Sequence, residues 1–582
     1  MAYQKNKSET YAFGGGINVK SSQYVTEKNE VLRLVNMNFK SVGAFSKRAG
    51  TTFYLGATVS GRVGGLYEFE RLNGQSYIIA SANTNLYSVT NTNWNAVRSG
   101  LLNNGIFSFQ SFVDRLFAAN GQDFFKVTDS STTSNFSLPS GVTVGLGITA
   151  APVVGGGLSG IYVVGYGYLN DRGYYGPASG GVTVSLNGVS YSSIAFGGLS
   201  VPSGYGISAI VFYRSAAGQV NMYGTTQMSA TAGATFIDNA QITTRPAPEY
   251  VNFTLAPQYL ELFNNQLMLA GVSSTPSTLY WSDIGEPEGI DPAYNAEIRT
   301  NDSDVIQGIR AYQNDLIIAK RRSLHRLSGS DPTNFTVQQI TDQYGCLSHR
   351  TMITFNDQFV CLDEKGILSF NGANVNILSD KIESIFERMN VSAAINNALA
   401  IHYKKENQIW FHIPVDGSTI NNLTIVYDYI TNSFTTYEGF NASAIAVAKG
   451  AVSEKTVMYG GYTGTIAYFN DTVESDLGQG ITCLVQTRFV SNMGQSTEQQ
   501  FRRFFLNIDP VVGVTQPIYV NLKSNYGSTN IQSRVMYQSP FQSRIDFGIP
   551  AKTLSAEISH NSSTLDFKIF GFTIESRYQR AV

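Results

Sequence analysis

The stretch that decides the fold reads Asp315-Leu-Ile-Ile-Ala319, followed by a charged turn and Ser323-Leu-His-Arg-Leu327. The same order returns in Asp357-Gln-Phe-Val-Cys-Leu362, followed by a second turn and Ile367-Leu-Ser-Phe370. In both copies a polar residue precedes a short apolar strand, and a turn leads into a return strand in which apolar and polar residues alternate. Two strands joined in this way are typical of a β-hairpin. We therefore predict two consecutive hairpins here.

Five further hairpins with the same pattern occur on both sides of this stretch. They span residues 75–89, 114–127, 265–281, 407–428 and 454–469. Counted from the first polar residue of each, the seven hairpins lie 39, 151, 50, 42, 50 and 47 residues apart. A strand-built repeat of about 40 to 50 residues is the period of a β-propeller. The predicted fold is therefore all-β, with a propeller of about six or seven blades.

The interval of 151 residues between the hairpins that start at Asp114 and Asn265 predicts an inserted domain. Subtracting a normal step leaves about 100 residues, enough for one small domain. Composition changes in the same place, because Asp171 and Arg172 are the only charged residues between Ser130 and Tyr213. Gly and Pro interrupt this uncharged stretch too often for a membrane helix, and its strands alternate with turn residues. We expect an immunoglobulin-like or fibronectin type III-like β-sandwich at residues 149–245 and no membrane anchor.

Composition favours a soluble β protein with many turns. Of the 582 residues, 43% are hydrophobic, 12% aromatic and 14% charged, and 55 are glycine. The net charge of −2 gives no global argument for tight binding to nucleic acid or to an anionic membrane. The polar N-terminus lacks the apolar core of a secretory signal, so synthesis in the host cytoplasm is expected.

No pattern of residues predicts a metal site, a cofactor site or a catalytic site. Cys346, Cys361 and Cys483 are too few and too scattered for a disulfide framework or a zinc site, so buried free thiols are expected. The histidines, of which His402 and His412 could lie on adjacent strands, have no Cys or carboxylate at ligand spacing. We predict that the protein is not an enzyme. The alternative is a carbohydrate-binding or carbohydrate-cleaving propeller, which would need paired carboxylates in a shared pocket.

Three local features each have a functional or a purely structural interpretation. Lys320, Arg321 and Arg322 are candidate phosphate contacts, although three cations at a hairpin tip are commonly just solvated. Asn301-Asp-Ser-Asp304 is more typical of a turn closed by its own side chains than of a calcium loop. A helix is predicted at Asp380–Met389, with Asp380 and Glu383 as a capping box and an apolar stripe facing a sheet. The members of that stripe are Ile382, Ile385, Phe386 and Met389.

The N-terminal segment carries a resemblance to a known family. Its residues are Gly14, Gly15, Gly16 and Asn18 in one loop, Asn36 in an Asn-rich strand, and Arg48 and Gly50 in a Lys-Arg-x-Gly sequence. This opening resembles that of the tail nozzle proteins of short-tailed bacteriophages, also called packaged-DNA stabilisation or tail tubular proteins. Members often have proline where this chain has Ala49. Further matches follow in the family's order at 280–288, 304–309 and 345–350.

The resemblance implies a structural virion protein. It implies a ring, a hexamer, that lies below the head–tail adaptor or connector ring and contacts tail fibre, spike or needle proteins. Genomic double-stranded DNA would be retained by this ring and then ejected through its lumen, without sequence specificity. The implied location is the phage tail.

The expected domain order combines the repeats with this resemblance. Residues 1–55 are an N-terminal segment that joins a platform, and 56–148 form the first propeller blades. The insertion at 149–245 follows, and 246–474 complete the propeller. Residues 475–582, with long alternating strands, are expected to form a separate antiparallel β platform domain.

Overall fold

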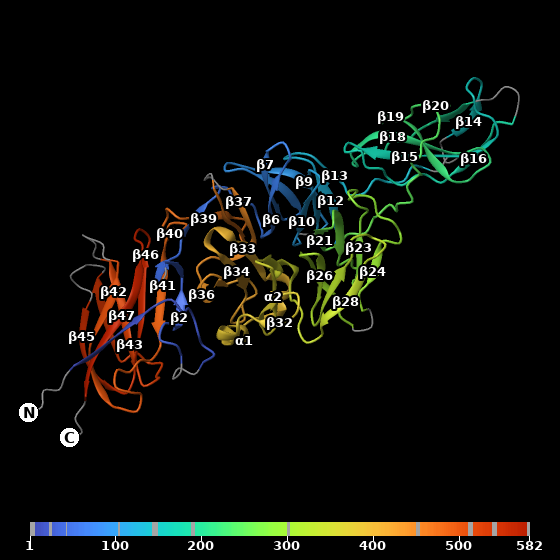
Figure 1. Ribbon diagram of the computed structural model, residues 1–582. Helices are drawn as coiled ribbons and strands as arrows, with labels where there is room; N and C mark the ends of the chain where they lie inside the picture. The colour runs from blue at the N-terminus through green and yellow to red at the C-terminus, as the bar shows by residue number, and fades with distance from the viewer. Residues whose placement is uncertain are drawn as a thin grey trace, which may run out of the picture. The chain divides into compact units, whose positions relative to one another are not determined.

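The computed structural model describes residues 6–21, 26–41, 43–102, 105–142, 149–187, 193–299, 303–449, 454–509, 516–537 and 544–578. The predicted all-β class is confirmed, because strands dominate these ranges and the helices are short (Figure 1). The chain divides into two compact units. Unit 1 comprises Met1–Glu68, Val89–Trp94 and Tyr344–Val582, and unit 2 comprises Phe69–Ser88 and Asn95–Gln343. In the described residues, no helix combines the length and the apolar character needed to cross a membrane.

Seven sets of four antiparallel strands, here called the repeat sheets, are formed by the described residues. Five of them are separate sheets, and the other two, both in unit 1, are parts of one 14-stranded sheet. Unit 2 contains three of them: β10–β13 (Ser108–Phe112, Arg115–Ala119, Phe124–Val127, Thr133–Asn135), β21–β24 (Tyr259–Phe263, Gln266–Ala270, Thr278–Trp281, Asn295–Glu297) and β25–β28 (Ile306–Tyr312, Asp315–Lys320, Leu324–Ser328, Thr336–Thr341). The sheet β6–β9 (Val63–Glu70, Ser76–Ala82, Asn85–Val89, Trp94–Ser99) contains residues of both units.

Unit 1 contains the other three repeat sheets. They are β29–β32 (Ile353–Phe355, Gln358–Asp363, Gly366–Phe370, Val375–Ile377), β33–β36 (Leu399–Tyr403, Gln408–Ile413, Leu423–Asp428, Ser433–Tyr437) and β37–β39 (Ala442–Lys449, Lys455–Gly461, Ile466–Asn470) with β5 (Gly50–Phe53). In the last sheet, Gly50–Phe53 runs antiparallel to β39, so a strand from the start of the chain completes a sheet that ends near residue 470. This pairing was not predicted, because the sequence analysis assigned residues 1–55 to the platform alone.

The seven predicted hairpins are confirmed as the second and third strands of the repeat sheets. In three of them the opening polar residue lies in the turn that leads from the first strand into the second. Asp114, Asn265 and Asp357 have φ values of 59°, 60° and 58°, in the left-handed region. Two-residue hairpin turns require such values and favour Asn and Asp. The polar residue therefore recurs because a tight turn recurs.

The insertion consists of two antiparallel sheets that share a core. One contains β14, β17 and β20 (Thr149–Val153, Ser193–Gly197, Phe236–Asp238), and the other contains β16, β15, β18 and β19 (Val182–Ser185, Ile161–Asn170, Ile207–Ser215, Met222–Ser229). Tyr166, Phe196 and Phe212 are fully buried between them. The pairing of the described strands differs from that of an immunoglobulin domain. Here β14, the first strand of the module, pairs with β17 and not with β15, the strand that follows it. A two-sheet module is thus present, and its immunoglobulin-like ancestry stays a prediction.

The C-terminal strands form two sheets together with strands from the N-terminal segment. One sheet contains β1, β3, β4, β42, β45 and β47 (Lys7–Ala12, Met37–Ser41, Ala44–Lys47, Gln499–Ile508, Arg544–Ala551, Lys568–Tyr578). The other is the rest of the 14-stranded sheet: β2 (Val31–Val35) pairs with β36 and with β41 (Gln479–Thr487), and the short β40 (Ser475–Asp476) pairs with β41 and β5. From β41 the sheet continues through β46 (Leu554–Ser562), β43 (Pro517–Ser524) and β44 (Gln532–Tyr537). Strands β44 and β45 were not predicted, because their exposed and polar positions obscure the alternation.

One hydrophobic core runs through the C-terminal sheets and two repeat sheets of unit 1. It joins Phe504 and Ile574 to Val360 and Phe411, all fully buried. The C-terminal strands therefore share their core with β29–β36 in place of the separate core that the sequence suggested.

The helical segment differs from its prediction. Asp380–Ile382 is a 3-10 helix and only Glu383–Glu387 (α1) is α-helical, with no side-chain cap at either start, so the predicted capping box is wrong. The side chain of Asp380 instead pairs with Lys20. A second helix, α2 (Val391–Asn397), was missed, and the Asn390 side chain caps it. The predicted apolar stripe is confirmed, because all four of its members are buried in the unit 1 core.

Candidate functional site

Two of the residues that carry the family resemblance, Asn36 and Arg48, meet at the buried side chain of Arg48. Its Nε donates to Asn36 Oδ1 at 2.9 Å, its Nη1 to Asp476 Oδ1 at 2.9 Å, and its Nη2 to the carbonyl of Glu438 at 3.0 Å. The guanidinium carbon lies 5.2 Å from the ring centre of Phe440 and 5.6 Å from that of Tyr437. Arg48 therefore ties the N-terminal segment to a repeat sheet and to β40 at one point, which we call the arginine joint.

Asn36 completes this joint through its backbone and its side chain. Its φ of 56° lies in the left-handed region, which Asn tolerates better than most residues. Its Oδ1 also accepts from the N–H of Glu438 at 2.9 Å, and its Nδ2 donates to the carbonyl of Thr482 at 2.9 Å. The Asn36 side chain therefore forms hydrogen bonds with Arg48, with the residue after a repeat sheet and with β41.

Gly15, Gly16 and Gly50 lie where another part of the chain approaches too closely for a side chain. At Gly16 the φ is +69°, and a Cβ would lie 2.8 Å from Ser433 Cβ. At Gly50 a Cβ would lie 2.3 Å from the carbonyl oxygen of Ser475. Gly14 also has a positive φ, of 149°, and a Cβ on Gly15 would meet Glu30 at 2.8 Å. Close backbone approach thus explains the glycines without a phosphate ligand.

Asn18 fixes the loop that these glycines open. Its Nδ2 donates to Glu30 Oε2 at 2.7 Å, and its Oδ1 accepts from the N–H of Ser21 at 3.1 Å. Asn18 and Glu30 are both buried, and Lys381 forms an ion pair with Glu30 at 3.0 Å. The loop is thus anchored to its own following strand and to the helical segment.

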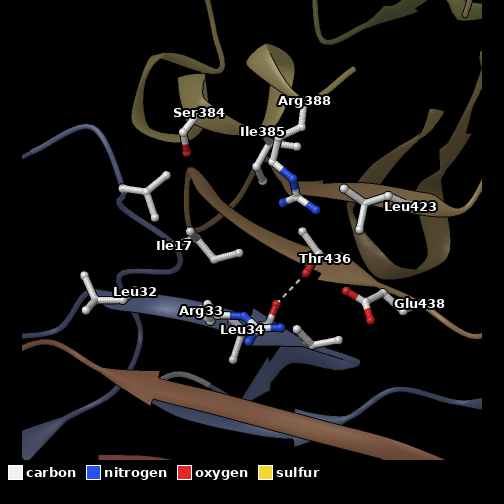
Figure 2. A pocket seen from close by; sticks show the side chains of 12 residues that line it. Ile17, Leu32, Arg33, Leu34, Ser384, Ile385, Arg388, Leu423, Thr436 and Glu438 are labelled. Carbon is white, nitrogen blue, oxygen red and sulfur yellow. Dashed lines mark hydrogen bonds between the residues drawn. The ribbon is translucent and has the colours of Figure 1, made fainter. Parts of the chain in front are cut away.

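A pocket of about 280 Å³ lies beside the arginine joint. Figure 2 shows Leu32, Arg33 and Leu34 of β2 on one side and Ser384, Ile385 and Arg388 on the other. The Thr436 hydroxyl donates to the carbonyl of Leu34 at 2.9 Å and holds the strands together at its base. The remaining lining residues are Ile17, Val19, Val35, Leu423 and Glu438.

The lining combines apolar side chains with charges at the rim. Arg388 is held by Asp416, with 2.8 Å between its Nε and Oδ1, while Arg33 and Glu438 are exposed. The lining residues include no histidine or cysteine that could activate the hydroxyls of Ser384 and Thr436. The pocket is suited to hold an apolar side chain next to a charged one.

The three consecutive basic residues Lys320, Arg321 and Arg322 lie in different environments. Lys320 is fully buried, and its Nζ donates to the carbonyls of Arg299 at 2.8 Å and Asp304 at 3.1 Å, so it does not point to solvent at the hairpin tip. Arg322 is exposed and Arg321 is half-buried, and their N–H groups donate to the Asp304 carboxylate. The Asp304 carboxylate thus closes the turn between β26 and β27 and not the turn of residues 301–304 that was predicted, and Asn301 and Asp302 lie outside the described residues.

The two histidines that were expected on adjacent strands do not face each other. His402 and His412 lie on adjacent strands, as predicted, but in the register His402 is opposite Ile409 and His412 is opposite Leu399. Burial lowers the pKa of His412 to about 3, so its ring stays neutral. The three cysteines are buried and free, as predicted. In the described ranges, no three residues among His, Cys, Asp and Glu are grouped so that they could hold a metal ion.

Comparisons with known proteins leave the family open. No family model and no curated protein matches the chain. Similar solved structures include the Pan2 WD40 domain of Neurospora crassa, with a TM-score of 0.33, 8% identity, and coverage of 73% of this chain and 94% of that one. They also include BBS1N in complex with ARL6DN, with a TM-score of 0.28, 10% identity, and coverage of 74% and 99%.

A third similar structure is an enzyme, the exo-β-1,3-galactanase of Phanerochaete chrysosporium with galactose. Its TM-score is 0.18 at 8% identity, with coverage of 89% of this chain and 100% of that one. At such TM-scores these similarities carry no inference about fold or activity.

Proposed function

We propose that the protein is a non-enzymatic structural component of a virus particle, the tail nozzle of a short-tailed bacteriophage. The observation that carries this proposal is the ordered set of sequence matches from Gly14 to Arg350. The positions of its N-terminal members support it. Asn36, Arg48 and Gly50 have packing roles at the arginine joint, where a structural protein would concentrate its essential residues.

The proposal includes a β-propeller with the seven repeat sheets as its blades. Four consecutive antiparallel strands are the unit of a propeller blade. Two features of unit 1 support closure of the ring. β5 completes the last blade as its fourth strand, and the Ser443 hydroxyl at the start of β37 donates to the carbonyl of Val63 at the start of β6, at 2.8 Å. In this scheme the insertion is an immunoglobulin-like or fibronectin type III-like module with altered strand pairing.

In the proposed particle, six copies form a ring below the head–tail adaptor. Fibre, spike or needle proteins attach to the ring, and genomic double-stranded DNA passes through its lumen. Retention of DNA comes from constriction of the lumen and not from tight phosphate binding, because each Lys or Arg held against a phosphate would strengthen binding and slow release. The near-balanced charge of the chain, with 40 Lys and Arg against 42 Asp and Glu, agrees with such a conduit.

Electron microscopy tests the assignment directly. Negative-stain images of the purified protein, and of particles labelled with an antibody against it, should show a sixfold ring on the tail axis. A stable monomer that hydrolyses glycans would instead establish the carbohydrate-active alternative.

A DNA-binding titration tests the conduit. The assembled ring should bind duplex DNA no more tightly than the roughly 10⁻⁴ to 10⁻⁶ M of ordinary non-specific binding near physiological salt. Two duplexes of the same length and different sequence should bind alike. Sub-micromolar affinity that falls steeply with salt would refute release through a weakly interacting lumen.

A further inference from the structure

Two arginines of unit 1, Arg62 and Arg350, are packed near each other without an acidic partner. Arg62 directly precedes β6, and Arg350 lies in the 3-10 helix His349–Thr351 that precedes β29. In the described part of the chain, no carboxylate pairs with either guanidinium. Elsewhere the protein pairs its buried arginines, as Arg48 with Asp476 and Arg214 with Asp238 at 2.6 Å. What distinguishes Arg62 and Arg350 is that two such unpaired guanidinium groups lie close enough for the charge of Arg62 to lower the pKa of Arg350.

Each of the two guanidinium groups has only part of its hydrogen bonds satisfied by the protein. Arg62 Nη1 donates to Asn397 Oδ1 at 2.9 Å, and Arg350 Nη2 donates to the carbonyl of Ser443. The Nε and Nη2 of Arg62 and the Nη1 of Arg350 are buried and have no partner among the described residues. Guanidinium nitrogens only donate, so all three need an acceptor.

Fixed neighbours hold both side chains in place. The Tyr462 ring centre lies 5.5 Å from the guanidinium carbon of Arg62, and the Tyr462 hydroxyl accepts from the N–H of Asn421 at 3.1 Å. Asn421 in turn donates to the carbonyls of Asn397 at 2.6 Å and Ala442 at 2.9 Å. The donors are thus set in a frame of hydrogen-bonded side chains and strand ends.

The electrostatics of this cluster are unfavourable without a ligand. Burial, together with the charge of Arg62, lowers the pKa of Arg350 to about 9. The nearby His412 is neutral, its Nδ1 contacts Thr424 Oγ1 at 2.8 Å, and its Nε2 also has no partner. Both arginines are half-buried, but three of their nitrogens are fully buried, and the positive charge there is of the kind that proteins normally balance with an anion.

We propose that Arg62 and Arg350 form a binding site for a small inorganic oxyanion of the phosphate or sulfate class. A doubly negative oxyanion would balance both guanidinium charges, and its oxygens would accept from the three unpartnered nitrogens. A water molecule could accept one of these hydrogen bonds but would leave the charge in place. The inference is independent of the proposed role in a virus tail.

Thermal unfolding of the full chain in inorganic phosphate tests the site. Ionic strength is held constant with sodium chloride, since screening alone changes charge repulsion. A ligand that binds only the folded state raises the unfolding temperature in a concentration-dependent way. The wild type is expected to show this rise at millimolar phosphate. Arg350→Gln and Arg62→Gln should each weaken the apparent affinity more than tenfold.

The control is Arg544→Gln, which alters an exposed arginine that already has Asp546 as its partner. This variant should keep the wild-type response to phosphate. Calorimetric titration of the wild type with phosphate gives a second readout if a cluster variant fails to fold. Equal phosphate responses in all the variants, or no saturable heat of binding in the wild type, would overturn the proposal.

Discussion

Two joints connect distant segments of this chain, and they are built in different ways. The arginine joint buries Arg48 among strands and aromatic rings, and the segments that it connects also share strand pairs and one core. The insertion is held in unit 2 by polar contacts at the turn after β15, which we call the insertion joint. There Lys126 and Glu288 form a buried ion pair at 2.6 Å, and Asn170 Nδ2 donates to Glu288 Oε1 at 2.6 Å.

A second group of charges surrounds the insertion joint. Arg172 of the insertion and Arg71 both pair with Asp114, and Arg115 pairs with Asp171. These contacts are charged and local, and the core of the module also takes in Leu138 of the preceding segment. We infer that the arginine joint determines whether unit 1 folds, whereas the insertion joint determines where the module sits.

The largest expected effect comes from Arg48→Leu. The change keeps an apolar side chain but leaves the buried Asp476 carboxylate and the Glu438 carbonyl without their donor. Removing one partner of a buried ion pair typically costs about 3 to 5 kcal/mol. Denaturant unfolding of unit 1, followed by tryptophan fluorescence of Trp410, should show this loss. A change below about 1 kcal/mol, within the range of ordinary surface substitutions, would contradict the joint's structural role.

Acid should weaken the region of the arginine joint before the insertion joint. His412, whose ring packs 5.7 Å from that of Phe440, has its pKa lowered to about 3 by burial. The unfolded chain binds a proton on this residue near pH 6.5, so stability falls as the pH drops from about 6.5 towards 3, by about 1.4 kcal/mol per pH unit. At pH 4.5 the loss is about 3 kcal/mol.

The carboxylate of the insertion joint responds at lower pH. Burial raises the pKa of Asp114, but hydrogen bonds from Arg71 and the N–H of Leu72 outweigh it and hold that pKa at about 2. Its contribution is present above its unfolded pKa and is lost only as the pH falls towards 2. His412→Gln should flatten the stability curve between pH 6.5 and 4.5. An unchanged slope in this variant would assign the acid sensitivity to His402 or His560, whose pKa values burial also lowers.

A smaller and more local effect is expected from Glu288→Gln. The amide keeps the shape of the side chain but removes the charge that faces the buried Lys126 ammonium. A hydrogen bond to a charged group is worth about 1.5 to 3 kcal/mol. Hydrogen exchange should increase at residues 165–175 and stay unchanged in unit 1. The double variant Lys126→Met/Glu288→Leu should recover most of the loss, since an apolar pair can replace a buried ion pair.

Deletion of residues 149–243, replaced by a short Gly-Ser linker, should have the smallest effect on the rest of the chain. Both ends of an inserted module normally lie together at the surface, so its removal leaves the remaining cores intact. The unfolding temperature of the remainder should shift by only a few °C. Loss of all soluble protein would show that the insertion joint carries more of the fold than its polar contacts indicate.

The sequence by itself determined the all-β fold class, the seven hairpins and the buried apolar stripe of residues 382–389. The turns before three of the predicted hairpins need left-handed residues, which Asp114, Asn265 and Asp357 supply. The stripe from Ile382 to Met389 identified a buried face even though the helix there is shorter than predicted. These features are local, because they depend on the conformation of a few neighbouring residues.

Only the tertiary structure decided which distant residues meet. Arg48 and Asp476 are 428 positions apart, and nothing near either one indicates the other. β5 completes a sheet formed some 400 residues later, and Lys320, in a basic triplet, is buried by the carbonyls of Arg299 and Asp304. Arg62 and Arg350, which are 288 positions apart, lie close enough for the charge of one to lower the pKa of the other. Such contacts depend on how strands from separate parts of the chain pack, which local periodicity does not encode.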